Sequence, residues 1–143
     1  MWDTAGQERF KSLIPSYLKN ANCVILTYDI TDRSSFTSLN KWLSDAKDNI
    51  TEGTYLILCG NKIDLNDKRV IAKEDGEKFA KDNEIDYAET SATTGEGINE
   101  LFNTIISKFC NVPIINREDK DNGDDLDGDG SHNIALKDLT KEE

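Results

Sequence analysis

Three short apolar segments alternate along the chain with longer segments of mixed polarity. The apolar segments cover residues 24–30 (VILTYDI), 55–60 (YLILCG) and 85–90 (IDYAET). Their length and composition predict buried β-strands. Each is followed by a polar turn and then by apolar residues at helical spacing. The chain therefore predicts three strand–helix repeats.

The segments of mixed polarity predict one helix after each strand. In the first helix we expect Ser34 or Ser35 to cap the N-terminus. The second covers residues 73–83 and turns Phe79 and Ala80 toward the core. The third has the most regular apolar face. The apolar residues at helical spacing are Phe36, Leu39, Leu43, Ala46 and Ile50 in the first, and Ile98, Leu101, Phe102, Ile105, Ile106 and Phe109 in the third.

Three repeats of this kind favour an α/β fold with a doubly wound, mostly parallel sheet, because parallel neighbours cannot be joined by tight turns. In such sheets ligands bind at the carboxyl ends of the strands. We therefore expect functional residues in the loops at residues 29–33, 61–65 and 91–97.

Charge divides the chain into two parts. Residues 1–110 carry 13 Lys and Arg against 18 Asp and Glu, and residues 111–143 carry 4 against 10. We expect a folded domain over 1–110 and an acidic tail over 111–143 that buries too little apolar surface to fold. A net charge of -11 without a basic cluster argues against nucleic acid and anionic lipid as partners.

Cysteine usage predicts a reducing, cytoplasmic environment. Cys23, Cys59 and Cys110 are widely spaced, odd in number and set in apolar segments, as buried thiols usually are. The sequence contains neither a signal-peptide pattern nor an apolar run long enough to cross a bilayer.

The loop after the second strand reads Asn61-Lys62-Ile63-Asp64. A carboxylate at Asp64 can accept two parallel hydrogen bonds from the N1 and exocyclic amino groups of guanine, whereas adenine presents the wrong groups. Asn61 can brace the neighbouring loop, and the stem of Lys62 can cover the base. Taken alone, these four residues also suit an ordinary turn.

The loop after the third strand reads Glu89-Thr90-Ser91-Ala92-Thr93. Small residues at Ser91 and Ala92 let a backbone N–H approach a base, and the Ser91 hydroxyl can hold the Asp64 carboxylate. This pattern is weak by itself. It gains weight because it follows the strand next to the Asn61 loop.

The chain opens with the string WDTAGQERF at residues 2–10. Asp3 at a strand end can hold Mg²⁺ through water, Gly6 can approach a terminal phosphate, and Gln7 can orient an attacking water. In this order, WDTAGQERF, NKID and ETSA make the chain similar to the small GTPases, and specifically to the Rab family. RFKSLIPSY at 9–17 and YDIT at 28–31 extend the likeness toward the Golgi-associated branch.

The resemblance covers residues 2–109 and implies a switch that binds GTP or GDP with Mg²⁺, hydrolyses GTP and recruits effectors in vesicle traffic. It implies that a base site is formed by Asn61, Lys62, Asp64, Ser91 and Ala92.

The same resemblance implies roles near the phosphates and on the surface. Gln7 would position the hydrolytic water, Asp3 would lie near Mg²⁺, and Gly6 would sense the γ-phosphate. Effectors and regulators would bind through residues 7–17, at Golgi or vesicle membranes.

The chain departs from the family pattern in three places. The family's phosphate loop, GxxxxGK[ST], does not occur in these 143 residues. We therefore expect this polypeptide by itself to bind GTP weakly and not to hydrolyse it, and the strand at 24–30 to be an apolar edge. Thr93 replaces the usual lysine, and the last residues, 140–143, include no prenylation signal, so we expect no direct membrane anchor.

Two readings remain open beside an N-terminally incomplete Rab GTPase. One is a non-enzymatic module that holds effectors through residues 10–17. The other is calcium binding in the tail, where Asp125, Asp127 and Asp129 precede Gly130, although Leu136 stands where the bidentate Glu belongs. His132 is expected to be an exposed side chain.

Overall fold

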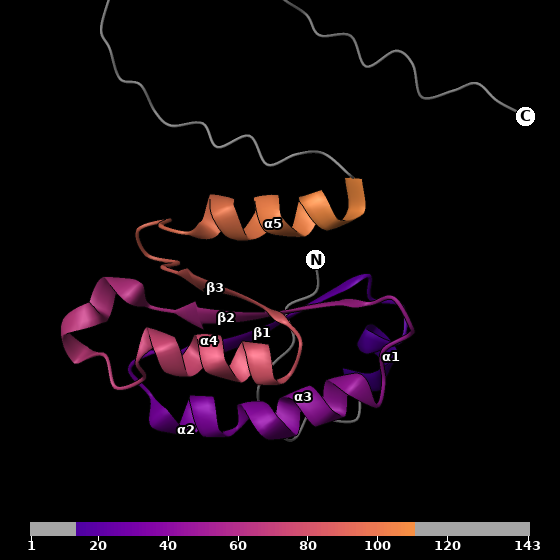
Figure 1. Cartoon of the computed structure of the whole chain (residues 1–143), viewed down its shortest axis with the longest axis horizontal. Coiled ribbons are helices and arrows are strands. Elements are labelled where there is room, and N and C mark those ends of the chain that lie inside the picture. Colours follow the sequence, from indigo (N-terminus) through magenta and orange to yellow (C-terminus); the bar gives the residue numbers. More distant parts are fainter. Residues whose placement is uncertain (1–13, 111–143) are drawn as a thin grey trace, which may run out of the picture.

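The computed structural model describes residues 14–110, which form an α/β layer structure around a parallel sheet (Figure 1). The strands are β1 (Cys23–Asp29), β2 (Tyr55–Asn61) and β3 (Asp86–Thr90), in the order β1-β2-β3. Both neighbouring pairs are parallel. The predicted fold class is therefore confirmed, and the strands begin and end within two residues of the predicted positions.

Helices lie on both faces of this sheet, as a doubly wound fold requires (Figure 1). One face carries α2, α3 and α4, and the other carries α5. The short α1 precedes β1, and a 3-10 helix, η2, directly follows β2. Their bounds are Ile14–Leu18 for α1, Arg33–Thr37 for α2, Leu39–Lys47 for α3, Ile63–Lys68 for η2, Lys73–Asp82 for α4 and Ile98–Cys110 for α5.

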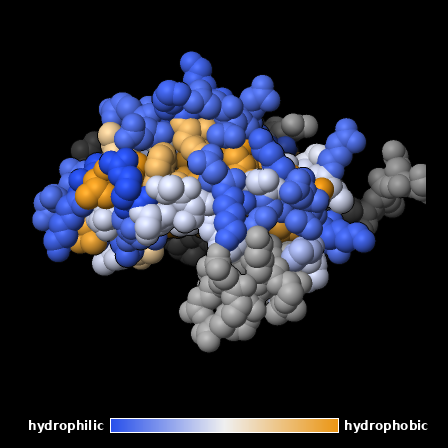
Figure 2. Space-filling view, turned by 90° about the horizontal axis from the view of Figure 1, so that it is seen from below, coloured by the Kyte–Doolittle hydropathy of each residue, from blue (hydrophilic) through white to orange (hydrophobic). Residues whose placement is uncertain are grey.

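The core is divided by the sheet because side chains alternate across each strand. Beneath α3 and α4, Leu26, Tyr28 and Leu58 are buried together with Ala80 of α4. Seen from the side of α2 and α3, this part of the surface is largely hydrophilic, with hydrophobic side chains showing between the charged ones (Figure 2). Toward α5, the buried residues are Ile57, Cys59 and Leu101.

The first predicted helix is two helices, and its predicted cap was wrong. Asp32 is the N-cap of α2, where its carboxylate accepts hydrogen bonds from the backbone N–H and the hydroxyl of Ser34. A carboxylate there also offsets the positive end of the helix dipole. The helical pattern is interrupted at Ser38, between α2 and α3, and α3 ends at Lys47, before Ile50.

Helix α4 approaches the sheet closely at Gly76. A Cβ atom at this position would lie 2.5 Å from the Tyr28 hydroxyl oxygen and 2.6 Å from that of Tyr87. Phe79 packs against the same core and Ala80 is buried, as predicted. The glycine therefore sets how near α4 can come to β1 and β3.

Helix α5 buries one side and exposes the other. Leu101 is 4% exposed, whereas Phe102, Ile106 and Phe109 are 39–50% exposed. Within residues 14–110, β1 is an edge of the sheet, as predicted for the strand at 24–30. No helix in this described part of the chain is long and apolar enough to span a membrane.

Candidate guanine-base site

The ends of the three strands meet in register. Asp29 at the end of β1 pairs with Asn61 at the end of β2, and Asn61 pairs with Thr90 at the end of β3. The loops that follow therefore start side by side at the left end of the sheet in Figure 1. The three loops in which the sequence predicts functional residues therefore lie together at the carboxyl ends of the strands.

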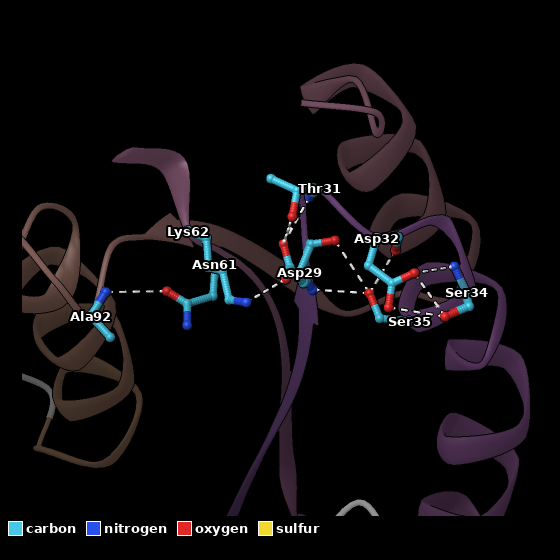
Figure 3. A network of polar contacts seen from close by, with 8 residues as sticks. All are labelled: Asp29, Thr31, Asp32, Ser34, Ser35, Asn61, Lys62 and Ala92. Atoms are coloured by element: carbon cyan, nitrogen blue, oxygen red, sulfur yellow. Dashed lines mark hydrogen bonds and ion pairs between the residues drawn. The ribbon is translucent and has the colours of Figure 1, made fainter. Parts of the chain in front are cut away.

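Asn61 joins the second loop to the third (Figure 3). Its side-chain Oδ1 accepts a hydrogen bond of 3.2 Å from the backbone N–H of Ala92 and a longer one of 3.4 Å from the Thr90 hydroxyl. The bracing role that the sequence predicted for Asn61 is therefore present. These hydrogen bonds connect the second loop to the third.

Ser91 orients the carboxylate of Asp64. Its side chain is fully buried, and its hydroxyl donates a hydrogen bond of 2.6 Å to Asp64 Oδ1. The same hydroxyl accepts the backbone N–H of Thr94 at 3.1 Å, so its orientation is fixed from both sides. Asp64 itself is exposed. Among the described residues no other group donates to this carboxylate, and Oδ2 remains an acceptor for a ligand.

Lys62, the residue after Asn61, forms an ion pair with Asp29 (Figure 3). Its backbone is left-handed, with φ 72°, and its ammonium group lies 2.6 Å from Asp29 Oδ2. The hydrogen bond and the charge of Asp29 raise the pKa of Lys62. About half of the Lys62 side chain is exposed, so its stem can cover a base.

Asp29 is a site residue to which the sequence analysis gave no role of its own. Its Oδ1 accepts hydrogen bonds from the Thr31 backbone N–H at 2.8 Å and from the Thr31 hydroxyl at 2.7 Å. Desolvation raises the pKa of Asp29, but the hydrogen bonds from Lys62 and Thr31 outweigh it, and the pKa lies below its ordinary value. An acidic residue at a strand end was the signal that could have identified it.

The ion pair between Arg69 and Glu89 was also not predicted from the sequence. Arg69 follows η2 and Glu89 lies on β3, and their side chains form a two-pronged ion pair. The residues are 20 positions apart, and no spacing pattern connects them. An arginine just after the Asp64 loop was the only available signal.

Several predicted site residues lie outside the described residues. Asp3, Gly6 and Gln7 belong to this group, so the predictions about Mg²⁺, the γ-phosphate and the hydrolytic water stay predictions. The acidic tail, with its candidate calcium ligands and His132, also lies outside them. Within residues 14–110, no group of three or more His, Cys, Asp and Glu side chains is arranged to hold a metal ion.

Of the predicted effector segment, residues 7–17, the structure describes only the last part. This part falls in α1, and the side chains of Pro15, Ser16 and Tyr17 are exposed. Cys59 is a buried free thiol, as predicted, and Cys23 is a partly buried one. Burial raises the pKa of both thiols.

The described groups fit a guanine base. An oriented, solvent-accessible carboxylate can accept from the N1–H and amino groups of guanine, while adenine has an acceptor at N1 and would leave the carboxylate without a donor. Asp64, Asn61 and Lys62 come from one loop, and Ser91 and Ala92 from the next. The base-site residues predicted from the sequence are thus brought together at one end of the sheet.

Comparison with known proteins identifies the lineage. A sequence model of the Ras family matches residues 1–111. The chain is 45% identical over 110 residues to "GTP-binding protein ypt5" of Schizosaccharomyces pombe (strain 972 / ATCC 24843), covering 76% of this chain and 52% of that protein. It is 44% identical over 111 residues to "Ras-related protein Rab-4A" of Mus musculus, covering 78% and 51%.

The Rab-4A protein of Bos taurus is 43% identical over the same number of residues, 111. The chain therefore spans about half the length of the curated relatives it matches. These matches and the parallel sheet agree with the motifs read from the sequence. The chain belongs to the Ras family of small GTPases and, within it, to the Rab group.

Proposed function

We propose that the loops after β2 and β3 recognise the guanine base of GTP and GDP. Asp64 reads the base edge, Ser91 and Asn61 hold the two loops in place, and Lys62 covers one face of the ring. The observation that carries this proposal is the 2.6 Å hydrogen bond from Ser91 to Asp64, which orients the carboxylate.

The strength of base binding follows from the number of hydrogen bonds. Two hydrogen bonds to a charged group contribute about 3 to 6 kcal/mol, which corresponds to roughly millimolar binding. Purified chain labelled with ¹⁵N should therefore show saturable shifts of the Lys62, Ser91 and Ala92 amide signals with GMP. AMP is the control ligand, because it carries the same ribose and phosphate but a different base. Equal shifts with AMP would contradict the proposal.

We also propose a role in GTP hydrolysis. Gln7 would position the attacking water, Gly6 would contact the γ-phosphate, and Asp3 would hold Mg²⁺ through water. This proposal rests on the family membership and on the order of these residues in the sequence. Its direct test is a Gln7→Leu variant of a chain that binds GTP, which should keep its nucleotide but lose hydrolysis.

A second candidate is a module that binds effectors without hydrolysis. The observation that favours it is that α1, the described end of the predicted effector segment, exposes the side chains of Pro15, Ser16 and Tyr17. Titration with a fluorescent GDP analogue, with and without Mg²⁺, separates the candidates. Tight, Mg²⁺-dependent binding favours the GTPase, and a cooperative melt without such binding favours the module.

The cellular role that we propose is vesicle-mediated transport at Golgi or vesicle membranes, with effectors and regulators bound through residues 7–17. Two relatives carry "Rab-4A" in their names and a third is called "GTP-binding protein", which supports the Rab lineage rather than a particular compartment. Imaging of the tagged protein against Golgi markers tests the compartment.

A further inference from the structure

We propose that Arg69 and Glu89 are positioning residues for the base-reading carboxylate of Asp64, because their paired side chains fasten the loop that carries Asp64 to the strand that leads into Ser91. The inference rests on the proposed function, since Asp64 must read guanine for its position to matter.

The pair has the geometry of a strong interaction. Arg69 Nη1 lies 2.7 Å from Glu89 Oε1, and Nη2 lies 3.1 Å from Oε2, so the guanidinium fork meets both carboxylate oxygens. The side chains are only 19% and 13% exposed. Two-pronged geometry and low exposure distinguish this pair from ordinary surface ion pairs, which contribute little.

Arg69 is also fixed within its own segment. Its Nε donates to Asn66 Oδ1 at 2.8 Å, and Nη1 donates to the carbonyl of Ile71 at 3.2 Å. The guanidinium therefore holds residues on both sides of Arg69 while it reaches β3. A movement of the loop after β2 must carry the guanidinium with it.

Glu89 is fixed equally firmly on its side. The Tyr87 hydroxyl donates to Glu89 Oε1 at 2.8 Å and lies 3.0 Å from the hydroxyl of the buried Tyr28. A Cβ atom at Gly97 would lie 2.1 Å from the Glu89 carbonyl oxygen, so the end of the third loop packs directly on this residue. Glu89 thus provides a rigid anchor two positions before Ser91.

Two side-chain contacts therefore connect the segment after β2 to the end of β3 and the loop that follows it. One is the hydrogen bond from Ser91 to Asp64, and the other is the ion pair between Arg69 and Glu89. Asp64 is exposed, and a single hydrogen bond leaves a carboxylate free to turn about it. The second contact, five residues further along the loop, restrains the backbone segment that carries Asp64 and so limits where its carboxylate can lie. Burial raises the pKa of Glu89, but the hydrogen bonds from Arg69 and Tyr87 lower it by more, so the anchor stays charged at neutral pH.

The test compares GMP with IMP in the full 143-residue chain, because IMP lacks only the exocyclic amino group. Wild-type chain should prefer GMP by about tenfold, as expected for one hydrogen bond to a charged group. Arg69→Lys keeps the charge but loses the fork, and should reduce this preference to below about threefold. The amide exchange of Thr94, whose N–H bonds to Ser91 Oγ, should also accelerate without any ligand.

Arg33→Ala is the matched control, because the Arg33 guanidinium also reaches this segment, at the Val70 carbonyl, but does not touch β3. It should leave the preference unchanged. If Arg69→Lys folds and keeps both the wild-type preference for GMP over IMP and the wild-type exchange rate of Thr94, the positioning role of Arg69 and Glu89 is wrong. The proposed guanine site would not be affected by that result. A wild-type chain without preference overturns the proposed function as well. If Arg69→Lys does not fold, the isosteric Glu89→Gln variant decides by the same two readouts.

Discussion

The ammonium group of Lys62 lies 2.6 Å from the carboxylate of Asp29, which places a side chain from the end of β2 against the end of β1. The contact joins a predicted base-site residue to one that the sequence analysis did not single out. In the proposed base site, this contact restrains the lysine and so reduces the entropy lost when its stem is ordered over the ring.

The ion pair between Asp29 and Lys62 makes the stability of the folded protein depend on pH. The pKa of Asp29 is lowered in the folded protein, so its contribution is complete above the ordinary pKa of about 4 and is lost as pH falls through the lower folded value. The Lys62 side chain is half exposed, so solvent screening keeps this contribution small. Melting curves should show Asp29→Asn below wild type at pH 6 and approaching it as the pH falls below the ordinary pKa of about 4. A constant difference would contradict this account.

Removal of the Ser91 hydroxyl should affect both stability and recognition. Ser91→Ala leaves the Thr94 N–H without its acceptor and Asp64 without its donor, at a cost of about 1 to 3 kcal/mol. GMP binding should weaken by up to about tenfold, whereas AMP binding should not change. Ser44→Ala on the exposed side of α3 is the control. Denaturant unfolding and NMR titration measure the two effects, and unaltered GMP binding would refute the role of Ser91.

Gly76 offers a test of the packing between α4 and the sheet. Alanine is the better helix former by about 1 kcal/mol, so an open site would be stabilised by Gly76→Ala. Here the added methyl group meets the hydroxyls of Tyr28 and Tyr87 at 2.5 and 2.6 Å. We expect net destabilisation by about 1 to 3 kcal/mol, measured by denaturant unfolding against Glu77→Ala on the exposed side of α4. A stabilised variant would show that α4 can move away from the sheet.

Truncation of a side chain should cost more stability on the buried side of α5 than on its exposed side. Leu101 is buried against Ile57 and Cys59, so Leu101→Ala should cost about 2 to 5 kcal/mol. Ile106 is half exposed, and Ile106→Ala should cost clearly less. Comparable losses in denaturant unfolding would mean that the exposed side of α5 is covered in solution.

The strands and the base site could be predicted because their signals are local. Buried parallel strands are short apolar runs, and their common register brings Asn61, Asp64 and Ser91 to one edge without any further information. The two ion pairs that support this end of the sheet could not be predicted. Arg69 and Glu89, or Lys62 and Asp29, are far apart in sequence and look like ordinary charged residues until the fold places them together.

The break between α2 and α3 has a different cause. The hydroxyls of Thr37 and Ser38 donate to the carbonyls of Arg33 and Ser34, which are atoms of the helix itself. The break is slight, because the Ser38 backbone stays helical and its N–H still donates to the Ser34 carbonyl at 3.0 Å. Hydrophobic spacing cannot locate so small a break, and the apolar period continues through Ser38.

An Asp64→Asn variant tests most directly whether the Asp64 carboxylate accepts hydrogen bonds from the N1–H and amino groups of guanine. An amide at this position accepts from N1–H and donates, so it matches xanthine, which carries a carbonyl oxygen where guanine carries an amino group. NMR titration of the ¹⁵N-labelled chain with GMP and XMP should show wild type preferring GMP and Asp64→Asn preferring XMP. A variant that remains folded and keeps the wild-type order of preference would contradict the assignment of Asp64 as the base-reading residue.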